Sequence, residues 1–391
     1  MKVKTGLDNL IEMDFSPIQN ANIGVLCNAS SVDSNLRHIV DVLVDSNNIP
    51  KVIFAPEHGL YGYAQDQVGV SSIIHKKYEL PIISLYGETF DSLMPKPEDF
   101  SALDIVIVDI QDVGSRYYTY VWTASMILEI ARATDTKVLV LDRPNPIGGK
   151  ILEGSVQEND YLSFVGLYPL PIRHGMTVAE ILNYVNRYYQ IGADIETIPM
   201  SGWNRDMWFD ETGLLWVMPS PNMPTLNTAE VYPGMCLLEG TNISEGRGTT
   251  RPFEIFGAPF VNPYELVEKL ELCNLNGVKF RPLFFTPTFN KYAGQICGGA
   301  QIHILDRDEF RPVITGFAMI KSIYELYPDK FSFSPPPYEY ERNKLPFDIL
   351  TGSSRWREMI LKKAKLSEIE DEFSEQIEKF DRIRRNFLIY E

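Results

Sequence analysis

The sequence contains few of the residues that transition-metal sites usually require. It has 5 histidines and 4 cysteines in 391 residues. No CxxC, HxH or HExxH spacing occurs, so the sequence does not support a zinc ribbon or a zinc protease. The cysteines Cys27, Cys236, Cys273 and Cys297 are scattered and give no indication of a disulfide framework. We therefore expect no metal site.

Two glycine-rich phosphate-binding motifs are also missing. No GxGxxG follows the first predicted strand, and no GxxxxGK[ST] occurs in the chain. Nucleotide-binding folds use these glycines to bring backbone amides against phosphate groups. A nucleotide-dependent enzyme is therefore disfavoured, and we expect no cofactor.

Positive charge and long apolar runs are scarce as well. With 36 Lys and Arg against 52 Asp and Glu, the net charge of −16 argues against nucleic acid or an anionic membrane as partner. No apolar run approaches the roughly 20 residues of a membrane span. The opening MKVKTGLDNL lacks an apolar signal core, which predicts a cytoplasmic protein, or a secreted or periplasmic one if an export signal was removed. The oligomeric state is not predicted.

What the sequence does contain is a regular alternation of strand and helix patterns. Helical patterns such as Tyr120–Ala133 separate five apolar strand candidates: Asn22–Ala29, Val52–Phe54, Pro81–Tyr86, Leu103–Ile110 and Lys137–Leu141. This alternation predicts an α/β fold with a Rossmann-like, doubly wound, mainly parallel sheet.

The rest of the chain does not continue this regular alternation of strand and helix patterns. Helix patterns at 263–272 and 313–327 flank strand patterns at 278–285 and 297–304, which predicts a smaller C-terminal α+β domain. We place the domains at 1–258 and 259–391, with the second domain closing a cleft. Capping-box patterns predict helix starts at Thr177, with Glu180, and at Ser367, with Glu370.

The stretch KVIFAPEHG, residues 51–59, ends a predicted buried strand with a carboxylate and an imidazole. Ligands of open α/β sheets bind beyond the carboxyl ends of the strands. Glu57 therefore stands where a rigidly held general acid would be placed, with His58 beside it. The alternative is a strand-end acid that only hydrogen-bonds to a loop.

Polar residues also follow the other predicted strands, whose ends should meet at one edge of the sheet. These residues are candidates for a ligand site, but some have a structural alternative: Asp112 could form a turn, and Arg143 could form a structural salt bridge. His174 could simply end a strand. These candidates are Asp109, Asp112, Arg116, Arg143, Asn145, Arg173, His174 and Asn222.

The segment from Glu239 to Arg251 combines acids and arginines with three glycines. Glycine allows close approach of the backbone to a ligand, and arginine suits planar carboxylate recognition. A plain surface loop seldom needs this combination. We therefore predict that the segment binds a ligand through Glu239, Asn242, Glu245, Arg247 and Arg251.

Several long motifs, in order, resemble those of the NamZ-like exo-β-N-acetylmuramidases. They are APEHG, DIQDVGSRYYTY, LDRPNPIGG, PIRHGMT, PSPNMPT, LEGTNISEGRGTTRPFE and FTPTFNKYAGQICGGAQIHI. The resemblance implies a glycosidase that releases N-acetylmuramic acid from the non-reducing end of peptidoglycan fragments. It also implies an active site between a Rossmann-like domain and a smaller one, with Glu57 as the catalytic acid. The implied partner is a muropeptide or a peptidoglycan-derived disaccharide.

The sequence allows several identities for the second catalytic group. Glu239 or Glu245 could activate water or attack directly, or the substrate's acetamido group could attack with help from Asp109 or Asp112. Arg143, Arg247 and Arg251 are candidates for the muramic lactyl carboxylate. The residues expected to bind substrate are His58, Asp112, Arg116, Arg143, Asn145, Arg173, His174, Asn222, Asn242, Arg247 and Arg251.

Two other functions compete with this one. Glu57, His58, Asp109 and His174 could serve a metal-dependent hydrolase, because carboxylates and imidazoles are zinc ligands. A non-catalytic protein that binds cell-wall glycan is the second alternative. Activity that is insensitive to a chelator would exclude the metal-dependent hydrolase. Turnover of a muramic acid glycoside would exclude a non-catalytic glycan-binding protein.

Overall fold

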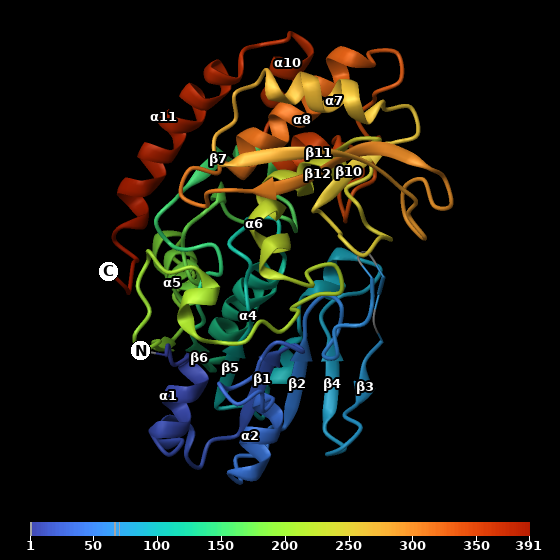
Figure 1. The fold of residues 1–391 in the computed structure, drawn as a ribbon. Coiled ribbons are helices and arrows are strands. Elements are labelled where there is room, and N and C mark those ends of the chain that lie inside the picture. Colours follow the sequence, from blue (N-terminus) through green and yellow to red (C-terminus); the bar gives the residue numbers. More distant parts are fainter. Residues whose placement is uncertain (1, 66–67, 70) are drawn as a thin grey trace.

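The computed structural model describes residues 2–65, 68–69 and 71–391. Within them, the larger part of the fold, here called the sheet unit, is built on a seven-stranded sheet in the order β3-β4-β2-β1-β5-β6-β9 (Figure 1). All neighbours are parallel except the pair of β3 and β4. The strands are β1 (Ile23–Cys27), β2 (Val52–Ala55), β3 (Ile73–Ile74), β4 (Pro81–Ser84), β5 (Ile105–Asp109), β6 (Lys137–Leu141) and β9 (Ile195–Ile198).

The strand order confirms the predicted Rossmann-like sheet. The chain proceeds from β1 to β2 and β4 on one side, and then from β5 onwards on the other side of β1. This reversal beside β1 is the switch point at which open α/β sheets bind their ligands. β2, which Glu57 follows after Pro56, lies next to β1.

Helices cover both faces of the sheet because its central strands are apolar on both sides. In β5, Ile105 and Ile107 pack in the cluster that contains α1 and α2, whereas Val106 and Val108 pack with α4. Side chains alternate along a strand, so this run is buried from both directions. The helices of this unit are α1 (Gly6–Glu12), α2 (Ile39–Asp45), α3 (Pro97–Phe100), α4 (Tyr120–Thr134) and α5 (Val178–Tyr188).

One predicted helix start is confirmed and one is wrong. Thr177 and Glu180 form the expected capping box at α5. The last helix, α11 (Leu366–Arg384), begins before Ser367, because Glu368 accepts the backbone N–H of Lys365 at 2.9 Å. Ser367 therefore lies inside the first turn and does not cap it.

The C-terminal unit contains a three-stranded antiparallel sheet in the order β10-β12-β11. The strands are β10 (Ile255–Ala258), β12 (Cys297–Ile304) and β11 (Val278–Phe285), and the helices are α7 (Pro263–Glu271), α8 (Pro312–Leu326), α9 (Pro346–Thr351), α10 (Ser354–Leu361) and α11. The smaller α+β part is thus confirmed. The boundary between 258 and 259 stays a prediction, and β10, which precedes it, pairs with β12, which follows it.

The remaining elements are short. β7 (Glu153–Val156) and β8 (Pro171–Arg173) form an antiparallel pair. The 3-10 helices are η1 (Ser16–Ile18), η2 (Phe90–Leu93), η3 (Asn159–Tyr161), η4 (Phe209–Thr212) and η5 (Cys236–Gly240). Within the described residues, no helix combines the length and apolar character needed to cross a bilayer.

Helix α6 (Leu226–Met235) runs between the sheet and the C-terminal unit (Figure 1). A Cβ on Gly234 would lie 1.8 Å from the carbonyl oxygen of Pro312, and a Cβ on Gly316 would lie 2.5 Å from that of Gly234. Only glycine permits this backbone contact between α6 and α8. One hydrophobic cluster also extends from Val106 in the sheet to Phe317 in α8, so the two units share a core.

The chain returns to the sheet unit after α11. The hydroxyl of Tyr390 donates to Asp142 Oδ2 at 2.7 Å, and the N–H of Ile389 donates to Glu180 Oε1 at 2.8 Å. The Tyr390 ring also packs edge-on against Trp203, with centroids 5.1 Å apart. Residues 389–391 therefore complete a polar network just beyond β6.

Three buried carboxyls make stability depend on pH. Burial raises the pKa of Asp142, Glu153 and Glu230 to about 7 in each case. Between the ordinary carboxyl value and pH 7, the folded state holds more protons than the unfolded state at these sites. Their contribution is therefore fully present below the unfolded pKa and is lost as the pH rises through about 7. A carboxyl with a lowered pKa, such as Asp8, changes the free energy of unfolding only at lower pH, where it takes up its proton.

Between pH 5 and pH 8 we expect these three carboxyls to lower the free energy of unfolding, and Glu153→Gln to remove one of the three contributions. Glu153 Oε1 accepts the N–H of Ile314 at 2.9 Å, and a glutamine oxygen can keep this bond. Urea unfolding at several pH values measures the effect. Glu271→Gln, an exposed change on α7, is the control. An identical pH slope in wild type and Glu153→Gln would contradict the assignment.

Candidate active site

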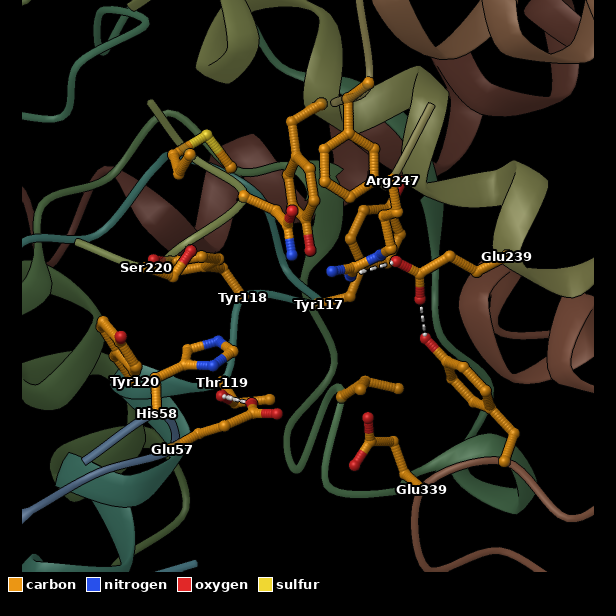
Figure 2. A pocket seen from close by; sticks show the side chains of 16 residues that line it. Glu57, His58, Tyr117, Tyr118, Thr119, Tyr120, Ser220, Glu239, Arg247 and Glu339 are labelled. Atoms are coloured by element: carbon orange, nitrogen blue, oxygen red, sulfur yellow. Dashed lines mark hydrogen bonds and ion pairs between the residues drawn. The ribbon is translucent and has the colours of Figure 1, made fainter. Parts of the chain in front are cut away.

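A pocket lies where the carboxyl end of the sheet meets the C-terminal unit. Its walls come from the end of β2, the segment before α4, the segment before α6, η5 with the following loop, and the chain between α8 and α9. The lining residues are Glu57, His58, Tyr117, Tyr118, Thr119, Tyr120, Val165, Ser220, Asn222, Met223, Tyr232, Glu239, Arg247, Phe253, Tyr338 and Glu339 (Figure 2).

Glu57 occupies the sheet side of this pocket. Its residue surface is 6% exposed, and its carboxylate points into the pocket (Figure 2). The hydroxyl of Thr119, the residue that precedes α4, donates to Glu57 Oε2 at 2.8 Å. A strand end and a helix start thus fix this carboxylate from two directions.

His58 lies beside Glu57 and is held by its own loop. Its φ of 68° lies in the left-handed region, where the chain reverses before Gly59. His58 Nδ1 lies 2.8 Å from the carbonyl oxygen of Ala64. Because a carbonyl only accepts, Nδ1 carries the proton in this hydrogen bond. Tyr120 packs edge-on against the ring, with centroids 6.4 Å apart.

The opposite wall carries an ion pair. Arg247 Nη2 donates to Glu239 Oε1 at 2.7 Å, and the hydroxyl of Tyr338 donates to Glu239 Oε2 at 2.7 Å. The Arg247 guanidinium also lies 4.9 Å from the centroid of the Phe253 ring. Glu239 therefore orients Arg247 at the pocket surface.

Glu245, the other acid of this segment, does not line the pocket. It is 1% exposed and accepts Lys291 Nζ at 3.0 Å, with Arg247 Nε 3.5 Å away. Its carboxylate supports the two cations from behind.

Several pocket residues were not among the predicted site residues. Glu339 and Tyr338 come from the chain between α8 and α9, and Tyr86 donates to Glu339 Oε2 at 3.0 Å from the end of β4. The tyrosines and threonine of the segment 117–120 belong to the motif DIQDVGSRYYTY, from which only Asp109, Asp112 and Arg116 were predicted as site residues. Their position directly before a helix was the signal that could have found them.

Family models match both parts of this architecture. The model described as "Exo-beta-N-acetylmuramidase NamZ, N-terminal" matches residues 23–227, and its C-terminal counterpart matches residues 230–390. The chain belongs to the NamZ exo-β-N-acetylmuramidase family. The resemblance drawn from the motifs is thereby confirmed.

Individual relatives agree with the family model. The chain is 43% identical over 390 residues to the peptidoglycan beta-N-acetylmuramidase NamZ of Bacillus subtilis strain 168, covering 100% of this chain and 92% of the relative. Two crystal structures of DUF1343 family proteins from Bacteroides fragilis have the same fold. Their TM-scores are 0.89 and 0.79 at 29% and 28% identity, each covering 100% of this chain and 99% of the other.

In this NamZ family member, four of the predicted substrate-binding arginines do not line the pocket. The N–H groups of these arginines donate to backbone carbonyls or to carboxylates elsewhere in the fold. Arg116 donates to the carbonyls of Ser155, Leu170 and Leu350, and Arg173 donates to that of Ile147 at 2.6 Å. Arg143 pairs with Asp109 and Arg251 with Glu254. Arg116, Arg143 and Arg173 thus join segments of the fold, whereas Arg251 forms a local pair three residues along the chain.

Five further candidates also lie outside the pocket. Asp109 is fully buried against Arg143, and Asp112 accepts the N–H of Gly114 at 2.6 Å with His174 Nε2 3.3 Å away. Asn145 Nδ2 donates to the Met176 carbonyl at 3.0 Å, and Asn242 bonds to the backbone of Lys330 and Ser332. Asn145 and Asn242 thus tie separate segments together, and Asp112 holds a local turn with His174 beside it.

Asn222 does line the pocket, and its Nδ2 donates to Gln65 Oε1 at 2.9 Å. The predicted residues that the structure brings together there are therefore Glu57, His58, Asn222, Glu239 and Arg247.

The alternative metal site is contradicted by these positions. Glu57 and His58 face the pocket, whereas Asp109 and His174 are held in separate buried pairs. In the part of the chain that the structure describes, no three His, Cys, Asp or Glu side chains are arranged to hold a metal ion.

Proposed function

We propose that this chain is an exo-β-N-acetylmuramidase in which Glu57 protonates the departing sugar oxygen. Its substrate is a muropeptide or peptidoglycan-derived disaccharide with N-acetylmuramic acid at the non-reducing end. The observation that carries this proposal is the carboxyl of Glu57, which is directed into the pocket between the two units of a NamZ family member.

The position of Glu57 suits a proton donor. Glycoside hydrolysis requires an acid at the leaving oxygen while positive charge develops at the anomeric carbon. The Thr119 hydroxyl fixes Oε2, which leaves Oε1 to carry the proton toward the substrate. A rigidly placed acid of this kind typically contributes about 10²–10⁴-fold to the rate.

Arg247 is the cation for the lactyl carboxylate of muramic acid. Of the three arginines considered from the sequence, it is the one that lines this pocket. Its guanidinium is fixed by Glu239 and by the Phe253 ring, so one edge of a planar donor is oriented before substrate arrives. Arginine recognises carboxylates through paired hydrogen bonds of this type.

Two disaccharides with the same sugars in opposite order test the proposal. We expect release of N-acetylmuramic acid from N-acetylmuramyl-β-1,4-N-acetylglucosamine and no cleavage of N-acetylglucosaminyl-β-1,4-N-acetylmuramic acid. Rates with and without EDTA should agree. Binding of the first disaccharide without release would favour the glycan-binding alternative. Equal cleavage of both disaccharides would contradict the exo-muramidase assignment.

A further inference from the structure

We propose that Glu339 is the second catalytic carboxylate, which takes a proton from the water that attacks the anomeric carbon. This inference rests on the proposed function, in which Glu57 supplies the acid. It assigns the base to the C-terminal unit and the acid to the sheet unit.

Glu339 and Glu57 enter the same pocket from different parts of the chain. Glu57 follows β2, and Glu339 lies between α8 and α9, yet both line the cavity. Figure 2 shows their carboxylates directed into the pocket from opposite walls, with Glu239 and Arg247 together elsewhere on its surface. Two carboxyls across a cavity are the arrangement that glycoside hydrolysis uses.

A tight turn presents Glu339 to the pocket. Backbone bonds of 3.0 and 2.9 Å between Tyr338 and Glu341 close the turn, which places Glu339 and Tyr340 at its tip. Glu339 has a φ of 49°, in the left-handed region that a side chain seldom adopts without support from its surroundings. The turn is anchored on both sides, because Tyr338 donates to Glu239 and Tyr340 donates to the Gly87 carbonyl at 2.9 Å.

Tyr86 hydrogen-bonds to Glu339 and also senses the charge of Glu57. It is 3% exposed, and its hydroxyl donates to Glu339 Oε2 at 3.0 Å. Burial raises the pKa of Tyr86 far above its ordinary value, and the nearby charges of Glu57 and Glu339 raise it further. The hydroxyl therefore stays a donor, and one tyrosine lies within electrostatic reach of both acids.

The two acids favoured from the sequence are less suited to this role. Glu239 is paired with Arg247, and Glu245 with Lys291. Taking up a proton would cost each of them an ion pair in a buried setting. The Tyr86 hydroxyl can keep its hydrogen bond to Glu339 Oε2 when Glu339 Oε1 is protonated.

The reaction balances in one step. The bond between C1 and the glycosidic oxygen breaks as Glu57 transfers its proton to that oxygen. A water oxygen bonds to C1 from the opposite face, and Glu339 takes one proton from this water. The products are the shortened glycan and N-acetylmuramic acid of inverted configuration. Proton exchange with solvent restores both carboxyls.

Two substrates separate the roles of the two glutamates. One is the disaccharide used above, and the other is a 4-nitrophenyl β-glycoside of N-acetylmuramic acid, whose leaving group needs little protonation. We expect Glu339→Gln to lower turnover of both by about 10³-fold, because water must be activated in either case. Glu57→Gln should lose most of its rate on the disaccharide and much less on the nitrophenyl glycoside.

An added nucleophile gives a second readout. Azide should restore nitrophenol release by Glu339→Ala, with an α-configured glycosyl azide as product, because azide replaces water and needs no base. Glu341→Gln, in the same turn but outside the pocket lining, is the matched control and should keep its activity. Circular dichroism and thermal melting verify that each variant is folded.

The outcomes are distinguishable. Near-wild-type turnover by folded Glu339→Gln, or a β-configured azide product, would overturn the role of Glu339 as a base. If wild type fails to release N-acetylmuramic acid, or Glu57→Gln retains full disaccharide turnover, the proposed function or its acid fails instead, whatever Glu339→Gln does.

Discussion

Glu57→Gln is expected to lower the turnover of N-acetylmuramyl-N-acetylglucosamine by about 10³-fold without unfolding the protein. Glutamine has nearly the same shape and keeps an oxygen that can accept the Thr119 hydroxyl, so the pocket wall should remain in place. What it loses is the proton for the leaving oxygen. Disaccharide kinetics and a thermal melt of the same preparation measure the two effects separately.

The control for this prediction is Glu268→Gln, an exposed change of the same chemistry on α7. It should leave both activity and melting temperature within error of wild type. Thr119→Val, which removes the hydrogen bond to Glu57 Oε2, should reduce turnover by a smaller factor. Wild-type turnover by Glu57→Gln would rule out this residue as the acid.

Arg247→Ala is expected to lower kcat/KM for muramic acid substrates by about 10²-fold, which corresponds to roughly 3 kcal/mol for a lost charged hydrogen bond. The variant also leaves Glu239 without its cationic partner beside the incoming carboxylate. A nitrophenyl glycoside of N-acetylglucosamine lacks the lactyl group, so its much slower hydrolysis should change little. The ratio of the two kcat/KM values is the measurement.

Arg251→Ala provides a matched control from the same glycine-rich segment. Arg251 pairs with Glu254 at 2.8 Å and lies outside the pocket lining, so its removal should leave the substrate preference unchanged. Equal losses on the two substrates with Arg247→Ala would refute recognition of the lactyl carboxylate by this residue.

The sheet could be predicted because its strands have a strong local signature. β5 and β6 are short apolar runs buried on both faces, and helical patterns flank them in sequence. The start of α5 was also predictable, since its capping box uses residues three positions apart. The start of α11 was not, because two overlapping acidic patterns lie within a few residues and only backbone geometry selects Glu368.

The pocket was only partly predictable. Glu57 and His58 follow a strand directly, so the sheet places them at its edge. Glu339 carries no such signal, because a turn of the C-terminal unit brings it to the pocket. Arg116 shows the opposite error: three backbone carbonyls, from segments far apart in sequence, take up its guanidinium. Backbone carbonyls that accept from a distant side chain leave no pattern in the sequence.

The return of residues 389–391 to the sheet unit has a consequence for biosynthesis. Asp142 and Glu180 leave the ribosome long before Ile389 and Tyr390, their later donors. During translation, the nascent sheet unit therefore holds these carboxylates without their final hydrogen bonds until nearly all 391 residues have been made. A fragment that stops at residue 227 would never gain these hydrogen bonds. We therefore expect the sheet unit in such a fragment to be less stable than in the full chain.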